Sequence, residues 1–144
     1  WPATSSSRRC PRILARVKRW PVAFLNDRIY DQGLTILDTE ADRIYLCSQQ
    51  PATYAEATST YALGNVTGIA IGAPADGTPD GRAVTVSAAS GGNITASGTA
   101  THYAIVDSAN SRLLASSTLT ESQAVYPPNT FSLGSFTVRF PDVS

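Results

Sequence analysis

The sequence predicts a mainly β protein: a single-domain antiparallel β-sandwich or small barrel with one N-terminal amphipathic helix. Three observations lead to this fold class. Short runs of alternating apolar and polar residues recur at intervals of about ten residues, as in all-β domains. Glycine, proline, asparagine and aspartate, the residues typical of turns, separate these runs. A helical period occurs once, near the start of the chain.

The predicted helix lies in residues 23–41, "AFLNDRIYDQGLTILDTEA". Asn26 or Asp27 is expected to cap its N-terminus, because short polar side chains accept hydrogen bonds from the first free amides of a helix. Gly33 in its middle costs about 1 kcal/mol relative to alanine. The apolar residues at close to helical spacing are Phe24, Leu25, Ile29, Leu34, Ile36 and Leu37.

The predicted strands follow the helix. In residues 43–48, Ile44 and Leu46 alternate with Tyr45 and Cys47, which is typical of a strand. The segments "THYAIVD" and "RLLASSTL" flank the turn sequence "SANS" and predict a hairpin. We expect a polar connection at 49–64, strands at 65–73, 82–89 and 136–140, a strand or turn at 91–98, and a turn-rich loop at 73–81.

The formal net charge of zero hides two unlike parts. Residues 1–21 form a basic arm with six basic residues and no acidic one, and the remaining residues carry five arginines and all eleven acidic residues. Such an arm could bind nucleic acid or an anionic membrane surface. The alternative is that the arm is upstream translation outside the native protein, or a disordered extension. The acidic remainder, 22–144, is predicted to be the β domain, and its lack of lysine argues against nucleic-acid binding there.

The alternative reading of the arm predicts a specific start. Lys18 and Arg19 can be encoded by a purine-rich ribosome-binding sequence, and Val22 by an alternative start codon, so we expect the natural chain to begin at Val22. Cys10 then falls outside the protein, and Cys47 is expected to be a small buried apolar residue. No segment approaches the roughly 20 apolar residues of a membrane span, so no membrane partner is expected.

His102, the single histidine of the chain, is the first candidate for catalysis. Side chains alternate across a strand, so His102 shares a face with Ala104 and Val106 and not with Asp107. No serine lies in a Gly-x-Ser-x-Gly pattern that could supply a nucleophile. The sequence therefore predicts a structural histidine and no catalytic residue.

Metal and cofactor sites are not expected either. Asp76 and Asp80 in "ADGTPDG" weakly resemble a calcium loop, but the regular ligand register and the closing glutamate are missing. Two cysteines and one histidine cannot complete a four-ligand zinc site of nitrogen and sulfur donors. The glycines form no phosphate-binding fingerprint. A chain poor in such groups and rich in serine, threonine and alanine suits a protein that presents a surface.

Four sequence segments carry a family resemblance: "LNDRIYDQGL"; "LCSQQPATYAEA" with "YALG" close behind; "GRAVTV"; and "SGTATHYAIVDSANSRLL". In this order they resemble a family of small virion structural proteins of tailed bacteriophages and prophages. The resemblance covers most of residues 24–143 and none of the basic arm, and it rests on order and spacing, because no single segment is specific. It implies a capsid decoration or other head-associated protein of the phage particle, with no catalytic residues.

The resemblance also implies partners: the major capsid protein or other virion proteins, and further copies of this chain in a homo-oligomer. Candidate contacts are Tyr54 and Tyr61 in the polar connection, and Asp76 and Asp80 in the turn-rich loop. For the tyrosines, ordinary packing beneath a long loop is the open alternative. A tail-fibre-associated or carbohydrate-binding β-sandwich module remains an alternative for the whole protein, and a small hydrolase using His102 is a third.

Overall fold

The computed structural model describes residues 27–142 and confirms a mainly β, antiparallel fold with one N-terminal helix. The basic arm, Cys10 and the expected start at Val22 lie outside these residues. Helix α2 spans Asp27–Glu40 and strand β1 spans Arg43–Cys47. The other elements are η2 (a π-helical turn, Glu56–Thr60), β2 (Ala62–Thr67), β3 (Ala75–Asp76), β4 (Arg82–Val86), β5 (Ala89–Ile94), β6 (Gly98–Asp107), β7 (Arg112–Val125), β8 (Thr130–Leu133) and β9 (Phe136–Phe140).

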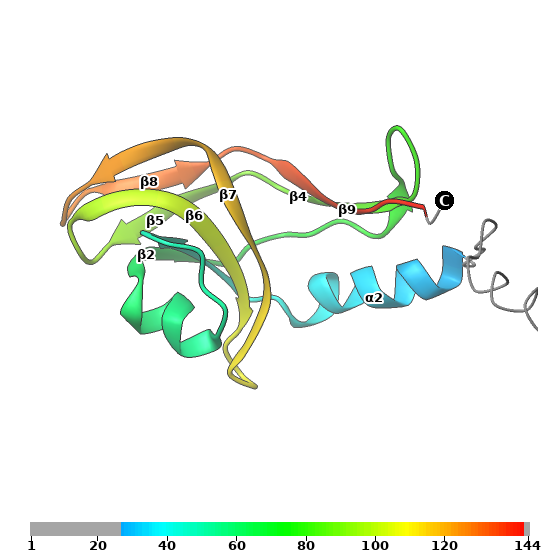
Figure 1. The fold of residues 1–144 in the computed structure, drawn as a ribbon, viewed down its shortest axis with the longest axis horizontal. Helices are drawn as coiled ribbons and strands as arrows, with labels where there is room; N and C mark the ends of the chain where they lie inside the picture. The colour runs from blue at the N-terminus through cyan, green and yellow to red at the C-terminus, as the bar shows by residue number, and fades with distance from the viewer. Residues whose placement is uncertain (1–26, 143–144) are drawn as a thin grey trace, which may run out of the picture.

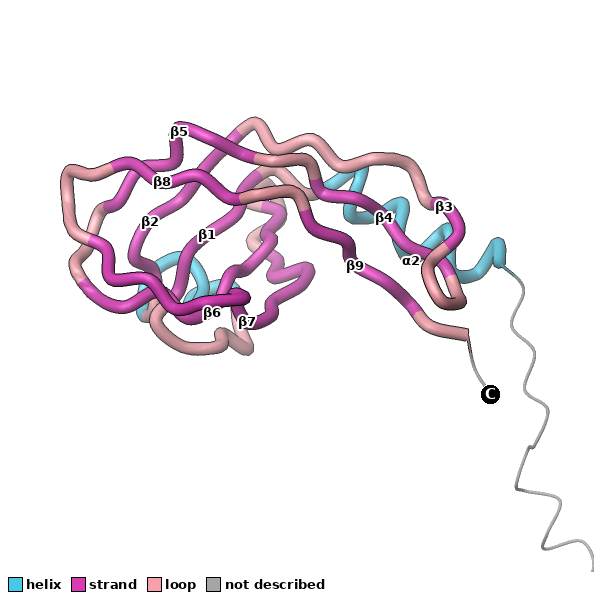
Figure 2. Tube along the Cα trace, turned by 90° about the horizontal axis from the view of Figure 1, so that it is seen from above, coloured by secondary structure: helices cyan, strands magenta, loops and turns pink. Residues whose placement is uncertain are grey.

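The strands form two antiparallel sheets. A six-stranded sheet with the order β7-β6-β1-β2-β5-β8 curves into a half-barrel, at the left of Figure 1. A small three-stranded sheet with the order β3-β4-β9 extends from the half-barrel beside α2 (Figures 1 and 2). The half-barrel and the smaller sheet together correspond to the sandwich or barrel that the sequence predicts.

A two-stranded ribbon joins the two sheets. Along the chain, β4 leads directly into β5, and β8 leads into β9. Because β4 pairs with β9 while β5 pairs with β8, the same two chain segments run side by side from the small sheet into the half-barrel (Figure 2). The position of the small sheet is therefore fixed by strand pairing at both ends of the ribbon.

The largest apolar cluster lies where the helix, the half-barrel and the small sheet meet. Leu34 of α2 is fully buried there against Ile44 and Ile105 of the half-barrel, together with Val84 and Val86 of β4. A second cluster fills the other end of the half-barrel and consists of Leu46, Leu63, Ile94, Ala100 and Val125. The alternation predicted for residues 43–48 is confirmed, since Ile44 and Leu46 join these inner clusters while Cys47 faces a third one.

The glycine inside α2 has a packing reason. A Cβ atom added at Gly33 would lie 3.2 Å from the ring of Phe140, so the missing side chain lets β9 lie close to the helix. The predicted hairpin is also present as β6 and β7, joined by a turn in which Ser111 adopts a φ of 54°.

Two predictions about the middle of the chain are wrong. Residues 49–64, predicted as a polar connection, are not only a connection, because they contain η2 and the start of β2. Residues 65–73 are not one strand: β2 ends at Thr67, and Gly68 follows with a φ of 71°. After this turn, only Ile71 contributes a single bridge, to Val86 of β4.

Candidate contact surface

The two candidate aspartates of the turn-rich loop lie at the tip of the small sheet, and each pairs with an arginine. Asp76 ends β3 and forms an ion pair with Arg82 of β4. Asp80 lies in the turn and accepts a hydrogen bond from Arg139 of β9 at 2.5 Å, and its backbone oxygen accepts a second one at 2.9 Å. The loop at 73–81 is therefore tied to β4 and to β9, and the two carboxylates do not converge on one site.

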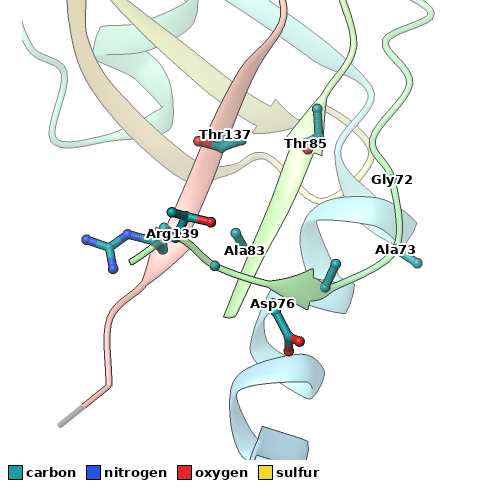
Figure 3. Close-up of a pocket in the computed structure, with 10 residues that line it drawn as sticks. Gly72, Ala73, Asp76, Ala83, Thr85, Thr137 and Arg139 are labelled. Atoms are coloured by element: carbon teal, nitrogen blue, oxygen red, sulfur yellow. The ribbon is translucent and has the colours of Figure 1, made fainter. Parts of the chain in front are cut away.

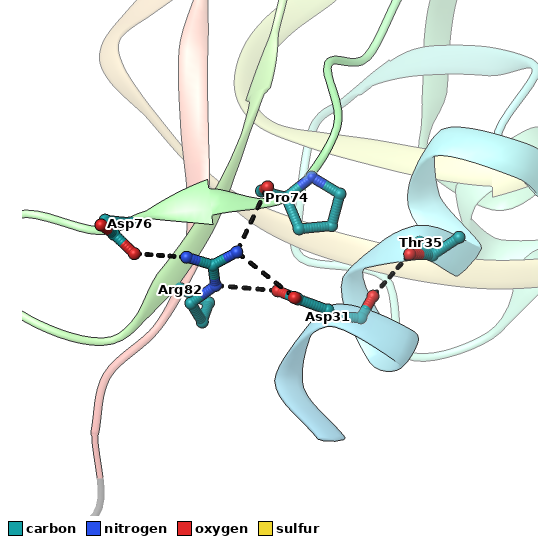
Figure 4. Close-up of polar contacts among 5 residues, drawn as sticks. All are labelled: Asp31, Thr35, Pro74, Asp76 and Arg82. Carbon is teal, nitrogen blue, oxygen red and sulfur yellow. Dashed lines mark hydrogen bonds and ion pairs between the residues drawn. The ribbon is translucent and has the colours of Figure 1, made fainter. Parts of the chain in front are cut away.

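Arg82 links this tip to helix α2, as Figure 4 shows. Its Nε donates to Asp31 Oδ1 at 2.8 Å, one terminal nitrogen donates to Asp31 Oδ2 at 3.3 Å, and the same nitrogen approaches the oxygen of Pro74 at 3.4 Å. The hydrogen bond to Asp31 is the main reason that the pKa of Arg82 is raised above its ordinary value. Arg82 thus joins β3, β4 and α2 through one permanently charged group.

Alternation along β4 and β9 gives the small sheet two different faces. Val84 and Val86 are buried toward α2, whereas Thr85 points the other way and is exposed. Thr85 is paired in register with Thr137 of β9, and Ala83 with Arg139. Figure 3 shows Ala83, Thr85, Thr137 and Arg139 on the side of the strands that faces away from the helix. We call these four residues the open face.

A shallow hollow of about 290 Å³ lies over the open face. The segment that contains Gly72 and Ala73 forms one side of the hollow, and the β3–β4 turn, with Gly77 and Thr78, closes one end. The lining consists of small and hydroxyl-bearing side chains, with Asp76 and Arg139 at its margin. Deep, mostly apolar pockets suit small ligands, whereas a shallow surface of this kind suits contact with a macromolecule.

The candidate tyrosines lie elsewhere, on the outer side of the half-barrel. Tyr54 and Tyr61 are both partly buried and pack against a small cluster formed by Cys47, Ala57, Ala104 and Val106. They flank η2, at a distance in the fold from the small sheet that bears Asp76 and Asp80. The structure therefore brings together neither the tyrosines with the aspartates nor the two loops that contain them.

A sequence signal for η2 is present in "TYAE". The backbone amide of Glu56 donates to Thr53 Oγ1 at 3.2 Å, and the Glu56 carboxylate accepts from the amide of Ala52 at 2.7 Å. This reciprocal arrangement resembles the capping box, in which Ser or Thr is followed three residues later by Glu or Gln. The motif could have located the helical turn within residues 49–64.

His102 and Cys47 lie directly opposite each other on β6 and β1. Thr101 Oγ1 donates to the oxygen of Ser48 at 2.8 Å, so in its 2.7 Å contact with Nδ1 of His102 the ring nitrogen is the donor. Cys47 is fully buried, its Sγ lies 3.6 Å from the oxygen of Ala57, and burial raises the pKa of its thiol to about 11. A protonated, enclosed thiol beside His102 is a packing group rather than an activated nucleophile.

Asp107 contacts the hairpin turn and not His102, in agreement with the predicted alternation. Its carboxylate accepts from the backbone amide of Asn110 at 3.2 Å and from Asn110 Nδ2 at 2.7 Å. Asp42 supports the same turn, accepting from the amide of Ser108 at 2.9 Å and from the Ser108 hydroxyl. Both carboxylates thus stabilise the turn that joins β6 to β7.

The open face and Arg82 could not be assigned from the sequence. The alternation of Val84 and Val86 with Thr85 predicts a strand with two different faces, but it does not say which strand lies beside it. That Thr137 and Arg139 belong to the same surface depends on the β4–β9 pairing, between segments far apart in the chain.

Comparisons of the chain with models of protein families, with curated proteins and with solved structures found no match. Among the described residues, no helix has both the length and the apolar character needed to cross a membrane. Residues 27–142 likewise contain no group of three or more histidine, cysteine, aspartate or glutamate side chains placed to hold a metal ion.

Proposed function

We propose that this protein is a virion structural protein of a tailed bacteriophage, of the capsid decoration or head-associated type, and that it binds the capsid surface through the open face. The observation that carries the proposal is the open face itself: an exposed, shallow sheet surface of small and hydroxyl-bearing side chains beside ion-paired groups. The resemblance of residues 24–143 to phage virion proteins supplies the class of partner.

The contacts of the small sheet support such a role. Binding is favoured when a surface is already ordered, because less side-chain and loop entropy is lost on association. Arg82 ties the sheet to α2, Arg139 ties the turn to β9, and Val84 anchors β4 in the main cluster. Arg82 and Val84 therefore hold the open face from behind, Asp80 fixes Arg139 at its margin, and Thr85 and Thr137 remain exposed.

The test is saturable binding of the purified full chain to expanded capsids of the phage that encodes it. Thr85→Arg and Thr137→Arg each place a long charged side chain at the centre of the open face and should weaken binding by about tenfold or more. Gln32→Arg, at an exposed position on α2, is the matched control and should bind as the unaltered protein does.

Two results would contradict the proposal. One is a lack of capsid binding at micromolar concentration by correctly folded protein. The other is capsid binding that both threonine variants retain in full while their circular dichroism is unchanged, since the contact would then lie elsewhere.

A further inference from the structure

One sheet edge among the described strands is both regular and unshielded. Edge strands carry unpaired backbone groups, which natural proteins shield with short strands, prolines or β-bulges. β3 has two residues and lies between Pro74 and Pro79, and register shifts interrupt the pairings of β7 and β8. β9, by contrast, pairs with β4 over its whole length in unbroken register, and its charged side chain, Arg139, is already engaged by Asp80. The outer edge of β9 is therefore the edge best suited to accept a further strand.

The backbone groups that β9 presents at this edge follow from alternation. Opposite residues of an antiparallel pair alternate between those that exchange hydrogen bonds and those whose N–H and C=O point away from each other. The amide of Gly72 donates to the oxygen of Thr85 at 2.9 Å, on the side of β4 that faces away from β9. Thr137, which lies opposite Thr85, therefore turns its N–H and C=O away from β4, and alternation gives Arg139 the same orientation. Within the described chain no backbone hydrogen bond is made to these outward groups.

We propose that β9 pairs antiparallel with β9 of a second copy of this chain, about a two-fold axis at Val138, to form a symmetric dimer. A two-fold interface uses the same patch on both partners, so the strand must be complementary to itself. With the axis at Val138, Thr137 of each copy lies opposite Arg139 of the other, and their outward backbone groups exchange hydrogen bonds. The small sheets of the two copies then form one continuous sheet, with both open faces on the same side.

The side chains of β9 are compatible with this register. Phe136 of each copy lies opposite Phe140 of the other, and Val138 lies opposite its counterpart, so the apolar row on the helix side continues across the axis. Phe140 is 40% exposed in the single chain, and the second strand would cover part of that surface. On the open face, Arg139 meets Thr137 and not a second arginine. Pairing centred on Arg139, or parallel pairing in register, would place the two arginines side by side.

A hollow at one end of the β9 edge gives the second copy a further surface to cover. About 270 Å³ of space lies between Thr118–Thr120 of β7 and the β8–β9 connection. Leu133, Ser135 and Phe136 are among the residues that line it. In the proposed register Ser135 lies opposite Pro141 of the other copy, so the chain that leaves β9 of that copy passes over the hollow. Covering the apolar part of the lining favours association.

Exchange of two side chains tests the register. Sedimentation equilibrium of the full chain should give a dimer. Thr137→Arg should weaken the dimer by about tenfold, because each new arginine then faces Arg139 of the other copy. The double variant Thr137→Arg/Arg139→Thr exchanges the two residues and should restore it. Thr85→Arg, on the same face but one strand further from the axis, is the matched control and should leave the dimer unchanged.

Cysteines on β9 provide a second test. In the Cys10→Ser background, Val138→Cys should form an intermolecular disulfide on mild oxidation, because directly opposite residues lie within the Cα separation that a disulfide spans. Thr137→Cys is more exposed but faces Arg139 of the other copy, so it should cross-link far less.

Three results would overturn the proposal. One is a monomer at about 100 µM, a concentration at which a micromolar dimer is almost fully formed. The others are a dimer that Thr137→Arg leaves unchanged, and a dimer that cross-links through Thr137→Cys instead of Val138→Cys. Capsid binding plays no part in these measurements, and Thr85→Arg should lose capsid binding while it keeps the dimer. This proposal and the proposed function can therefore fail separately.

Discussion

The half-barrel and the small sheet are built on different principles. The half-barrel encloses apolar side chains from all six of its strands, among them Ile44, Leu46 and Ile105. The small sheet buries one row of apolar residues against α2 and the half-barrel. Its tip is held by two ion pairs, Arg82 with Asp31 and Arg139 with Asp80.

This difference shows how a small domain can offer a rigid surface without a deep pocket. A sheet face buries apolar side chains only where other elements pack against it, and in the small sheet this is the helix side. The ion pairs of Arg82 lie on the helix side of the sheet and tie β3 and β4 to α2, whereas the Arg139–Asp80 pair lies at the edge of the open face and ties the β3–β4 turn to β9. The half-barrel supplies stability and the small sheet supplies the accessible surface.

The largest effect is expected in the half-barrel core. Ile105→Ala removes a fully buried side chain from the main cluster and should lower the free energy of unfolding by about 2–5 kcal/mol. Ile36→Ala, at a residue that is 44% exposed, is the control and should change it by less than about 0.5 kcal/mol. Urea unfolding measures both. Equal losses for the two variants would contradict the description of the core.

The next largest loss of stability is expected at a glycine of the small sheet, which we compare with a glycine of the half-barrel that has the same φ. Gly81 and Gly91 both have a φ of 77°, but a Cβ atom at Gly81 would lie 2.0 Å from the oxygen of Phe140, whereas one at Gly91 would meet nothing within 4 Å. Gly91→Ala should cost about 1–2 kcal/mol for the left-handed conformation alone. Gly81→Ala should cost at least about 1 kcal/mol more, because β9 must move. If Gly81→Ala and Gly91→Ala had equal midpoints of thermal unfolding, β9 would not lie against Gly81.

A smaller effect is expected when either carboxylate that pairs with Arg82 is removed, and it should differ between Asp31 and Asp76. The side chain of Asp31 is 31% exposed and accepts two hydrogen bonds from the guanidinium, whereas that of Asp76 is 91% exposed. Asp31→Ala should therefore speed amide hydrogen exchange in β4 more than Asp76→Ala does, and both effects should be smaller than that of Gly81→Ala. The opposite order would mean that the hairpin, and not the helix, holds Arg82.

The smallest effect concerns the pH dependence of the protein's stability, to which Asp42, next to β1 of the half-barrel, contributes. Burial acts to raise the pKa of this carboxyl, but the hydrogen bonds from Ser108 and the nearby Arg43 outweigh it, so the pKa is lowered in the folded protein. A lowered pKa stabilises the fold above the ordinary value of about 4, and this contribution is lost as the pH falls below it. Asp42→Asn should therefore reduce the difference in unfolding midpoint between pH 6 and pH 3. An unchanged difference would contradict this role.

Local features of the fold could be predicted from the sequence. The alternation in residues 43–48 and the turn residues between "THYAIVD" and "RLLASSTL" depend on neighbours in the chain, and so do the helical period around Leu34 and Leu37. For this reason the helix, β1 and the β6–β7 hairpin were predictable. The helical turn η2 was within reach as well, since Thr53 and Glu56 form a local capping pattern.

The candidate site could be predicted only in part. The sequence indicates Asp76 and Asp80 as candidate contacts in a turn-rich loop, but their partners Arg82 and Arg139 depend on the β3–β4 and β4–β9 pairings. Gly33 is unfavourable in a helix by propensity, and its packing reason, the ring of Phe140, lies more than a hundred residues away in the chain. Tyr54 and Tyr61 were equally compatible with contact or packing, and the structure places both against the cluster around Cys47.

The most direct test of the central claim is amide hydrogen exchange of the protein alone and bound to capsids. In the free protein, the buried strands β1 and β6 should exchange more slowly than β3 and the tip of β4. On capsids, the amides of β4, β9 and residues 72–78 should gain protection while those of β1 stay unchanged. Protection gained only on the outer side of the half-barrel, around η2, would contradict the claim that the small sheet is the contact surface.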